Sequence, residues 1–170
     1  MPGDGWRGRA DERADPAQVS SAGDALLPIV DPEAAPFWEG ARRGELCVPA
    51  CPETGRLFFP PRARSPYAPR RAPLWVAVSG RGSIWSFAVP HPPLLPPFDA
   101  LAPYPVVVVA LAEDPRVRLV GNLVACPGGA INEVPAATLS IGAPVGVVFE
   151  RVTDEIHLPR WRLEGSGGGR

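Results

Sequence analysis

Proline restricts the fold of this chain more than any other residue type, because it occupies 24 of the 170 positions. A proline lacks a backbone N–H and fixes its own φ angle, so it interrupts helices and is excluded from central strands. Most of the prolines fall between residues 49 and 73 or between residues 90 and 105. We therefore expect short strands joined by stiff, extended loops, in a mainly β fold.

The apolar runs outside these loops predict strands at residues 74–78, 82–89, 104–112, 117–125, 145–152 and 156–163. The sequence Ser-Gly-Arg-Gly at 79–82 predicts a turn or bulge between the first two. The sequence Glu-Asp-Pro at 113–115 predicts a hairpin turn. A central hairpin, followed by an interruption before the last pair, is the strand order of a five-stranded OB-fold barrel, with a β-sandwich as the alternative.

The remaining segments divide the chain into four parts. Residues 1–27 and 165–170 are polar or glycine-rich and predict flexible tails. Residues 28–73 are expected to hold an N-terminal helix, which begins after Asp31-Pro32 and ends near Gly44, and then an irregular segment with a small strand at 57–59. The barrel is expected to take residues 74–164.

The charge and the apolar pattern exclude several classes of function. All 17 basic residues are arginines, so no lysine is available for a Schiff base, and the net charge of −1 argues against general nucleic-acid binding. No apolar run reaches the roughly 18–20 residues that span a bilayer. No secretory signal stands at the N-terminus, so we expect a cytoplasmic protein without a membrane partner.

An ordered set of phrases carries a resemblance to a known family. These phrases are Pro-Phe-Trp-Glu-Gly at 36–40, Arg-Gly-Glu-Leu at 43–46, Gly-Arg-Leu-Phe-Phe-Pro-Pro-Arg at 55–62, Ser-Gly-Arg-Gly-Ser-Ile-Trp-Ser-Phe at 79–87, Val-Val-Phe-Glu at 147–150 and Leu-Pro-Arg-Trp at 158–161. Over residues 31–163 the chain resembles the rubredoxin-like zinc-ribbon/OB-fold accessory proteins, long catalogued as a domain of unknown function. The resemblance implies a helix, then a ribbon, then an OB barrel.

The ribbon of this family carries two C-x-x-C pairs, which hold zinc. The matching positions here are Cys51, Thr54, Ser65 and Ala68, so one of the four ligands is kept. Zinc takes four thiolate or imidazole ligands in structural sites, and Cys47 as a substitute would give only two thiolates. We therefore expect a degenerate ribbon without zinc.

The resemblance also implies a function. Members of the family often work beside thiolase-superfamily enzymes, thiolase-like aldolases that shorten steroid side chains, and hot-dog hydratases. We therefore expect a non-catalytic accessory subunit that stabilises such a partner in a hetero-oligomer and shapes its acyl-CoA site. A freestanding acyl-CoA or nucleotide-binding OB module is the alternative. An enzyme in its own right is disfavoured, since no paired carboxylates or nucleophile–base pair stand out.

Candidate ligand-binding residues come from an arginine-rich segment. Between Gly55 and Phe98 there are six arginines and no acidic residue, and arginine binds phosphate in a bidentate manner. A cleft for the CoA nucleotide of the partner's substrate would use Arg62, Arg64, Arg81, Trp85 and His91. The alternatives are a solvated arginine surface and, for the strand tryptophans, a place in the barrel core. No tightly bound cofactor is expected.

Candidate partner contacts come from two apolar segments. Phe37 and Trp38 lie on the predicted helix and are expected to contact a partner or the ribbon. The proline-rich segment 92–105 carries the other three candidates, Leu94, Leu95 and Phe98. Because such a segment is poorly suited to water, it is expected to pack on another subunit, to fold over the barrel or to line an acyl channel.

Overall fold

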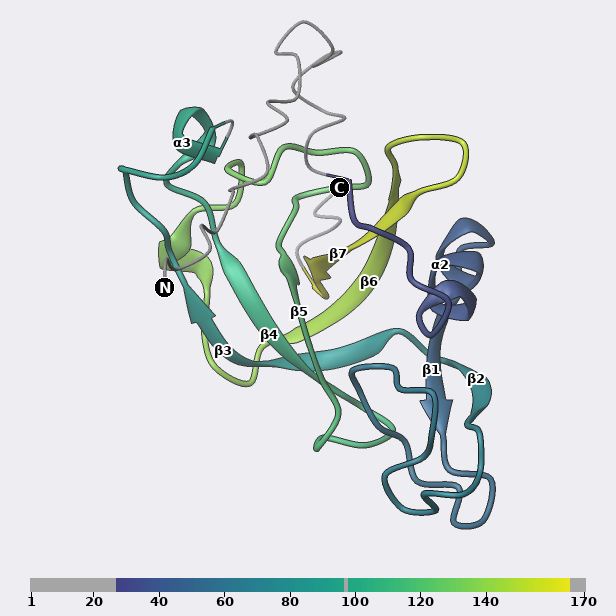
Figure 1. Ribbon diagram of the computed structural model, residues 1–170. Helices are drawn as coiled ribbons and strands as arrows, with labels where there is room; N and C mark the ends of the chain where they lie inside the picture. Colours follow the sequence, from purple (N-terminus) through teal and green to yellow (C-terminus); the bar gives the residue numbers. More distant parts are fainter. Residues whose placement is uncertain (1–26, 97, 166–170) are drawn as a thin grey trace, which may run out of the picture.

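The structure is a computed structural model that describes residues 27–96 and 98–165, so the predicted tails lie almost entirely outside the described residues. The elements, in chain order, are α2 (Ala35–Arg42), β1 (Leu46–Ala50), β2 (Leu74–Val78), β3 (Arg81–Ala88), α3 (Phe98–Leu101), β4 (Val106–Leu111), β5 (Arg118–Asn122), the 3₁₀ turn η2 (Ala136–Thr138), β6 (Pro144–Arg151) and β7 (His157–Leu163). Figure 1 shows a strongly curved sheet, with α2, β1 and β2 beside it.

The larger sheet has five antiparallel strands in the order β5-β4-β3-β6-β7. Its two outer strands meet through a parallel bridge between Leu123 and Trp161, where the Val124 N–H donates to the Trp161 carbonyl oxygen at 2.8 Å. This connection joins the ends of β5 and β7 and curls the sheet into a barrel. The mainly β, OB-fold prediction is confirmed.

Side chains alternate between the two faces of each strand, and those on the inner face fill the barrel interior. On β4, Val107, Val109 and Leu111 are fully buried, whereas Val106 and Val108 are only partly buried. Trp161 on β7 is 1% exposed, and its indole lies so close to Gly121 that a Cβ there would meet it at 2.9 Å. Close packing therefore restricts the size and shape of the side chain that each of these interior positions can hold.

A bulge on β3 changes one prediction. The register against β4 shifts between Ile84 and Ser86, so Trp85 is an extra residue in the strand. Phe87 packs against the core, but Trp85 is 50% exposed. Two-residue spacing predicts that Trp85 and Phe87 share a face; this is wrong, because the extra residue breaks the alternation.

The smaller sheet pairs β1 with β2 over five residues, from Leu46 opposite Val78 to Ala50 opposite Leu74. The sequence analysis did not predict β1. Pro49 argues against a strand because it has no N–H to donate, but its carbonyl oxygen still accepts a hydrogen bond from the Phe58 N–H at 3.0 Å. Residue 57, in the predicted strand 57–59, forms only an isolated bridge. The boundary at residues 73 and 74 stays a prediction.

Helix α2 lies within the helix predicted from the sequence, but it begins at Ala35 rather than directly after Pro32. The Asp31 carboxylate accepts from the Ala34 N–H at 2.7 Å, so it caps the turn that precedes the helix rather than the helix itself. Gly44 follows the helix with φ +77°, a left-handed conformation that favours glycine at helix ends. Among the described residues, no helix has the length and apolar character needed to cross a membrane.

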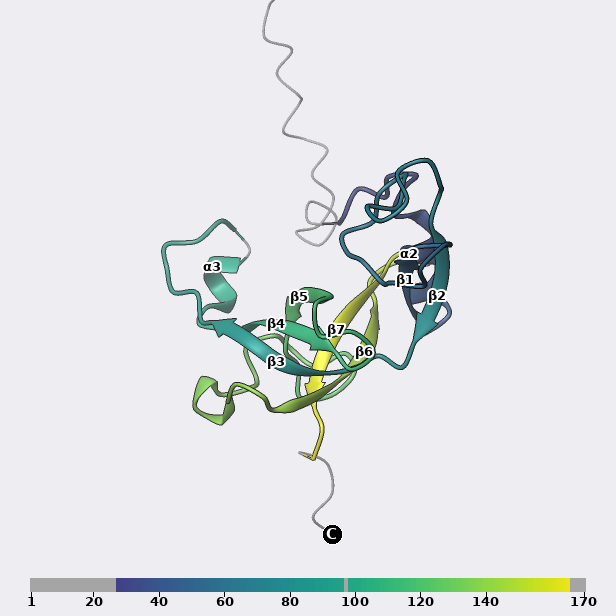
Figure 2. The same cartoon turned by 90° about the horizontal axis from the view of Figure 1, so that it is seen from below.

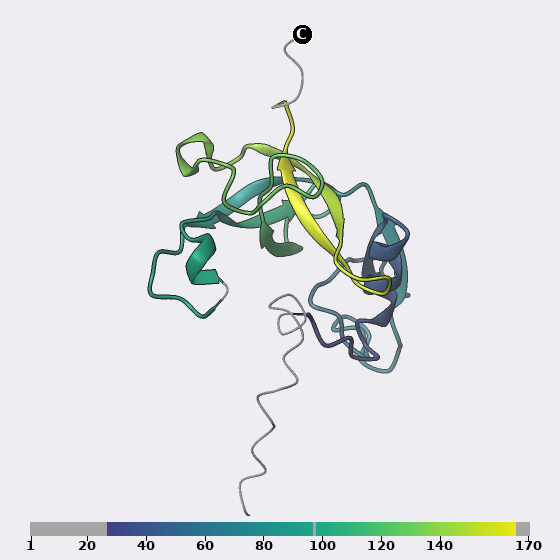
Figure 3. The same cartoon turned by 90° about the horizontal axis from the view of Figure 1, so that it is seen from above.

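A single core connects the two sheets. Phe37, Leu46 and Val48 from the helix and the smaller sheet pack in the same buried cluster as Val109 and Trp161 of the barrel. Figures 2 and 3 both show α2, β1 and β2 at one end of the curved sheet and α3 at the other. The ribbon region is therefore fixed to one end of the barrel, and the loop with α3 covers the opposite end.

Candidate functional site

The barrel-face pocket is a cavity of about 450 Å³ beside the junction of β5 and β7. It is lined by Leu27, Phe98, Leu101, Asn122, Gly128, Gly129, Ala130, Ile131, Glu150, Val152, Leu158 and Arg160. Its volume is in the range of small-molecule sites, and most of its lining side chains are apolar. The β3–β4 and β6–β7 loops contribute to it, and OB-folds bind ligands with these loops.

Polar side chains from three strands meet at one side of this pocket. The Arg160 guanidinium donates from Nε to Glu150 Oε2 at 2.7 Å and from Nη1 to Asn122 Oδ1 at 2.6 Å. The Arg160 side chain is 19% exposed, so this ion pair is better shielded than the surface pairs of the molecule. Because Arg160 and Glu150 neutralise each other, the pocket suits an uncharged, largely apolar group better than a phosphate.

A second apolar cluster forms the opposite side. Tyr104, Val124 and Ile131 are buried in it, and the rings of Phe98 and Tyr104 lie 6.0 Å apart. Leu94 also packs against this cluster, whereas its neighbour Leu95 is 80% exposed. The proline-rich segment therefore folds over the barrel with most of its apolar side chains and exposes Leu95.

The five predicted ligand residues stand on separate parts of the molecule. Arg62 lines a shallow hollow beside Trp75, and Arg64 donates to the Arg70 carbonyl oxygen at 3.0 Å, both at the ribbon end. Arg81 pairs with Glu164 at 3.0 Å. Trp85, also on β3, lies under the guanidinium of Arg118, 3.7 Å from the ring centroid.

His91, the fifth predicted ligand residue, is exposed in the loop after β3. Arg81 is neutralised by Glu164, and the Trp85 ring face is occupied by Arg118. None of the five lines the barrel-face pocket. Their role in binding CoA stays a prediction.

Two of the predicted partner contacts are part of the fold. Phe37 is 7% exposed and packs edge-on against Trp38, with ring centroids 5.1 Å apart, and against Phe59 at 5.7 Å. Phe37 therefore contacts the ribbon, and its contact with a partner stays a prediction. Trp38 is partly buried and lines a hollow with Ile156.

The sequence analysis missed the polar group at the barrel-face pocket. Arg160 belongs to the phrase at 158–161 but was not considered as a site residue. The sequence does indicate where Arg160 lies. It directly precedes a buried tryptophan on a strand, and because successive side chains alternate, Arg160 lies on the outer face. Asn122 carries no such signal, because its distance from Arg160 depends on the closure of the barrel.

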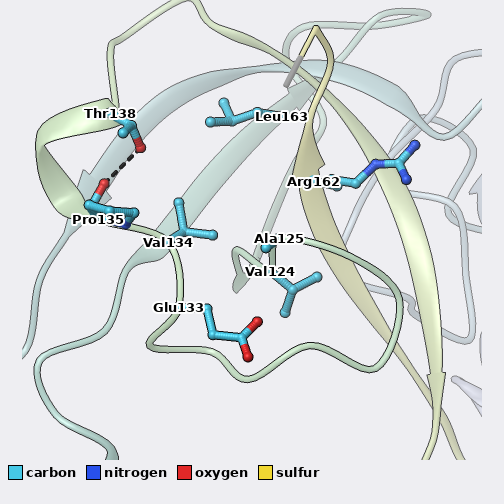
Figure 4. A pocket seen from close by; sticks show the side chains of 8 residues that line it. All are labelled: Val124, Ala125, Glu133, Val134, Pro135, Thr138, Arg162 and Leu163. Carbon is cyan, nitrogen blue, oxygen red and sulfur yellow. Dashed lines mark hydrogen bonds between the residues drawn. The ribbon is translucent and has the colours of Figure 1, made fainter. Parts of the chain in front are cut away.

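A second hollow, of about 220 Å³, lies beside η2 (Figure 4). The Thr138 hydroxyl donates to the Pro135 carbonyl oxygen at 2.7 Å, which closes the short turn. Figure 4 shows that the Arg162 guanidinium points away from the Glu133 carboxylate, so the two charges do not form a polar pair across the hollow. The remaining lining is mainly apolar, and this hollow carries no evident chemistry.

The ribbon loops bring the four predicted ligand positions into one region. Cys51 and Ser65 are each 1% exposed, and a backbone bridge joins Ser65 to Ala68. Burial raises the pKa of the Cys51 thiol, but hydrogen bonding from the surrounding Ser65, Thr54 and Glu53 outweighs it and lowers the pKa to about 7. In residues 27–96 and 98–165, no three His, Cys, Asp or Glu side chains cluster to hold a metal ion.

Comparisons with known proteins agree with this architecture. Residues 38–65 match the family model described as "ChsH2, rubredoxin-like zinc ribbon domain", and residues 75–150 match "ChsH2, C-terminal OB-fold domain". The chain is 28% identical to a chain of the solved structure described as "Ltp2-ChsH2(DUF35) aldolase", with a TM-score of 0.67 over 81% of this chain and 98% of that one.

Two curated relatives are similar in sequence. The 3-oxo-4,17-pregnadiene-20-carboxyl-CoA hydratase alpha subunit of Mycobacterium tuberculosis is 30% identical over 142 residues, which are 82% of this chain but only 39% of that protein. The DUF35 domain-containing scaffold protein of Methanothermobacter thermautotrophicus is 33% identical over 115 residues, 67% of this chain and 78% of the relative. On this evidence the chain belongs to the DUF35 family, in which a ChsH2-type zinc-ribbon domain precedes an OB-fold domain.

Proposed function

We propose that this chain is a non-catalytic accessory subunit of a thiolase-superfamily enzyme, either a thiolase or a thiolase-like retro-aldol lyase that acts on acyl-CoA substrates. The observation that carries the proposal is the similarity to the ChsH2 chain of an aldolase, over nearly the whole length of that chain. The names of the other relatives, a hydratase alpha subunit and a scaffold protein, support a role beside a partner enzyme.

The exposed apolar side chains support a contact with another protein. Leu95, Val120 and Trp85 are 80%, 69% and 50% exposed. Protein interfaces are enriched in aromatic residues and arginine at their centres, and the Trp85–Arg118 pair has this composition. We expect the outer face of β3, β4 and β5, together with the loop that carries Leu95, to face the partner.

The alternative is a freestanding acyl-CoA-binding module. The barrel-face pocket favours it, since its volume of about 450 Å³ and apolar lining would accept part of an acyl chain. In the accessory-subunit proposal the same pocket would extend the acyl-CoA site of the partner. A steroid side chain is one such acyl group, and the hydratase relative supports it by its name.

Co-expression with a candidate thiolase-like partner enzyme tests the proposal. We expect one hetero-oligomeric peak by size-exclusion chromatography with light scattering, and acyl-CoA turnover only when both chains are present. A separate peak and an enzyme that is fully active alone would reject it. Calorimetric titration of the isolated chain with an acyl-CoA then tests the alternative, which requires measurable affinity without any partner.

A further inference from the structure

We propose that the ribbon is held together without a metal ion, by two self-closed loops around Cys51 and Ser65 and by the packing of Arg56 and Phe58 against Tyr67, at the positions of a zinc ribbon. The family model that matches residues 38–65 describes a zinc ribbon, but the donor set of this chain does not fit that metal. This inference concerns the fold of the ribbon, and it holds whether or not the proposed partner is correct.

The chemistry of the four positions argues against zinc. Structural zinc sites use four cysteine or histidine ligands in a tetrahedron. Here Cys51 offers one thiolate, Thr54 and Ser65 offer hydroxyl groups that bind zinc weakly when neutral, and Ala68 offers no ligand atom. A binding site with a single thiolate cannot supply the folding free energy that structural zinc provides.

Cys47 does not complete the set. Its side chain points to α2, since a Cβ added at Gly40 would lie 2.6 Å from the Cys47 sulfur. Its nearest charged neighbours are Glu45 and Arg43, and burial raises the pKa of its thiol. Cys47 therefore packs as a buried apolar residue against the helix, away from the ribbon loops.

The first ribbon loop keeps a closed shape through its own hydrogen bonds. The Cys51 N–H donates to the Arg56 carbonyl oxygen at 2.9 Å, and the Gly55 N–H donates to the Cys51 carbonyl oxygen at 2.8 Å. Gly55 adopts φ +68°, which only glycine reaches readily, so the tight turn is built into the sequence.

The second loop repeats this arrangement around Ser65. The Tyr67 N–H donates to Ser65 Oγ at 3.2 Å, from two residues further along the chain. The Ser65 N–H donates to the Arg71 carbonyl oxygen at 3.0 Å and closes the loop. Ser65 is 1% exposed, so this buried hydroxyl fixes the second loop at the position of a metal ligand.

Side-chain packing links the two loops. The Arg56 guanidinium of the first loop lies 4.1 Å from the centroid of the Tyr67 ring of the second. The rings of Phe58 and Tyr67 meet edge to face with centroids 6.4 Å apart, and Phe58 is 6% exposed. A cation–π pair and an aromatic pair therefore perform the cross-linking that a zinc ion performs in a four-cysteine ribbon.

The first test uses the full-length protein as purified. We expect no stoichiometric zinc by elemental analysis and the same melting temperature with and without a strong chelator. Ser65→Ala should lower the melting temperature by about 2–8 °C, because it leaves a buried hydrogen-bonding group unpaired. One zinc per chain, with loss of stability on chelation, would overturn the proposal, as would a Ser65→Ala variant as stable as the parent protein.

A second variant tests whether the four positions converge. The triple substitution Thr54→Cys, Ser65→Cys and Ala68→Cys should bind one Co²⁺ and show the visible absorption of a tetrahedral thiolate site. The matched control Thr54→Ala, Ser65→Ala and Ala68→Ser should not. A folded triple-cysteine variant that fails to bind Co²⁺ would overturn the proposed arrangement. If that variant does not fold, the zinc content and the Ser65→Ala result decide.

Discussion

The Glu113 carboxylate accepts a hydrogen bond from the Ser79 N–H at 2.6 Å, and the two residues are 34 positions apart in the chain. This contact joins the turn between β4 and β5 to the connection between β2 and β3. Burial raises the pKa of Glu113, but its hydrogen bonds with Ser79 outweigh burial and lower the pKa from its ordinary value. A single carboxylate thus stabilises the place where the ribbon strand enters the barrel.

A lowered pKa in the folded state predicts how stability depends on pH. The contribution of Glu113 is complete above its unfolded pKa of about 4.3 and is lost as the pH falls through the lower folded value. Glu113→Gln should therefore show a shallower loss of stability in acid and, because the site is exposed, cost only about 0.5–1 kcal/mol at neutral pH. Urea unfolding at a series of pH values measures both effects.

The control for this variant is Glu155→Gln, which changes an exposed carboxylate in the β6–β7 loop. It should keep the acid dependence of the parent protein. Equal pH dependence for Glu113→Gln and the parent would contradict the assignment of the acid-sensitive contact to Glu113.

The contacts of some residues can be predicted from the sequence, and those of others cannot. The closed shape of the loops around Cys51 and Ser65 follows from the sequence, because each loop is short and closes through its own backbone hydrogen bonds. The contact between Arg160 and Asn122 spans 38 residues and depends on how β7 meets β5, which no local pattern encodes. The bridge between Leu123 and Trp161 creates this contact only when the barrel closes.

Strand β3 is the middle strand of the larger sheet. It pairs with β4 along one edge and with β6 along the other, at Arg81 to Ser83. A Cβ on Gly82 would lie 2.4 Å from the Ala110 carbonyl oxygen and 2.6 Å from a Val109 methyl group. The first of these atoms belongs to backbone in a paired strand, so it cannot move without disturbing β4.

Gly82→Ala should therefore destabilise the protein by about 3 kcal/mol, through overpacking rather than backbone conformation. Gly146→Ala is the matched control: Gly146 lies on the neighbouring strand β6, and its Cβ would meet only the flexible Glu164 side chain, at 3.3 Å. Its cost should be below about 1 kcal/mol. Chemical denaturation of both variants checks the difference, and equal costs would refute the close approach of β3 to β4.

The strands of the barrel and β2 of the smaller sheet could be predicted from the sequence, and β1 could not. Runs such as 104–112 are long, β-branched and bounded by turn residues, so β4 follows from composition. Strand β1 contains Pro49 and is stabilised mainly by pairing with β2 and by burial of all five residues. The bulge at Trp85 adjusts the pairing of two strands and leaves no mark in either sequence.

At the scale of the whole molecule, Leu95 is the most useful position for testing the partner surface. Its side chain is 80% exposed beside α3, at the end of the barrel away from the ribbon. Because it makes little contact within the chain, its substitution should leave the fold unchanged. This separates an effect on binding from an effect on stability.

Leu95→Asp should keep the melting temperature within about 2 °C and weaken the complex with the partner enzyme at least about tenfold, because a charge would replace an apolar contact. Ile141→Asp is the control, since Ile141 is 64% exposed in the segment before β6. Affinity is measured by biolayer interferometry with the purified partner. Unchanged affinity for Leu95→Asp would show that this loop lies outside the interface.

The core shared by Phe37, Leu46 and Trp161 has a consequence for how this family can diverge. An isolated ribbon has almost no hydrophobic interior, so the loss of one cysteine unfolds it and is removed by selection. A ribbon whose helix and strands are buried against a barrel remains folded after such a loss. Cysteines can then disappear one at a time through nearly neutral steps, and the loops they leave are open to selection for contacts with new partners.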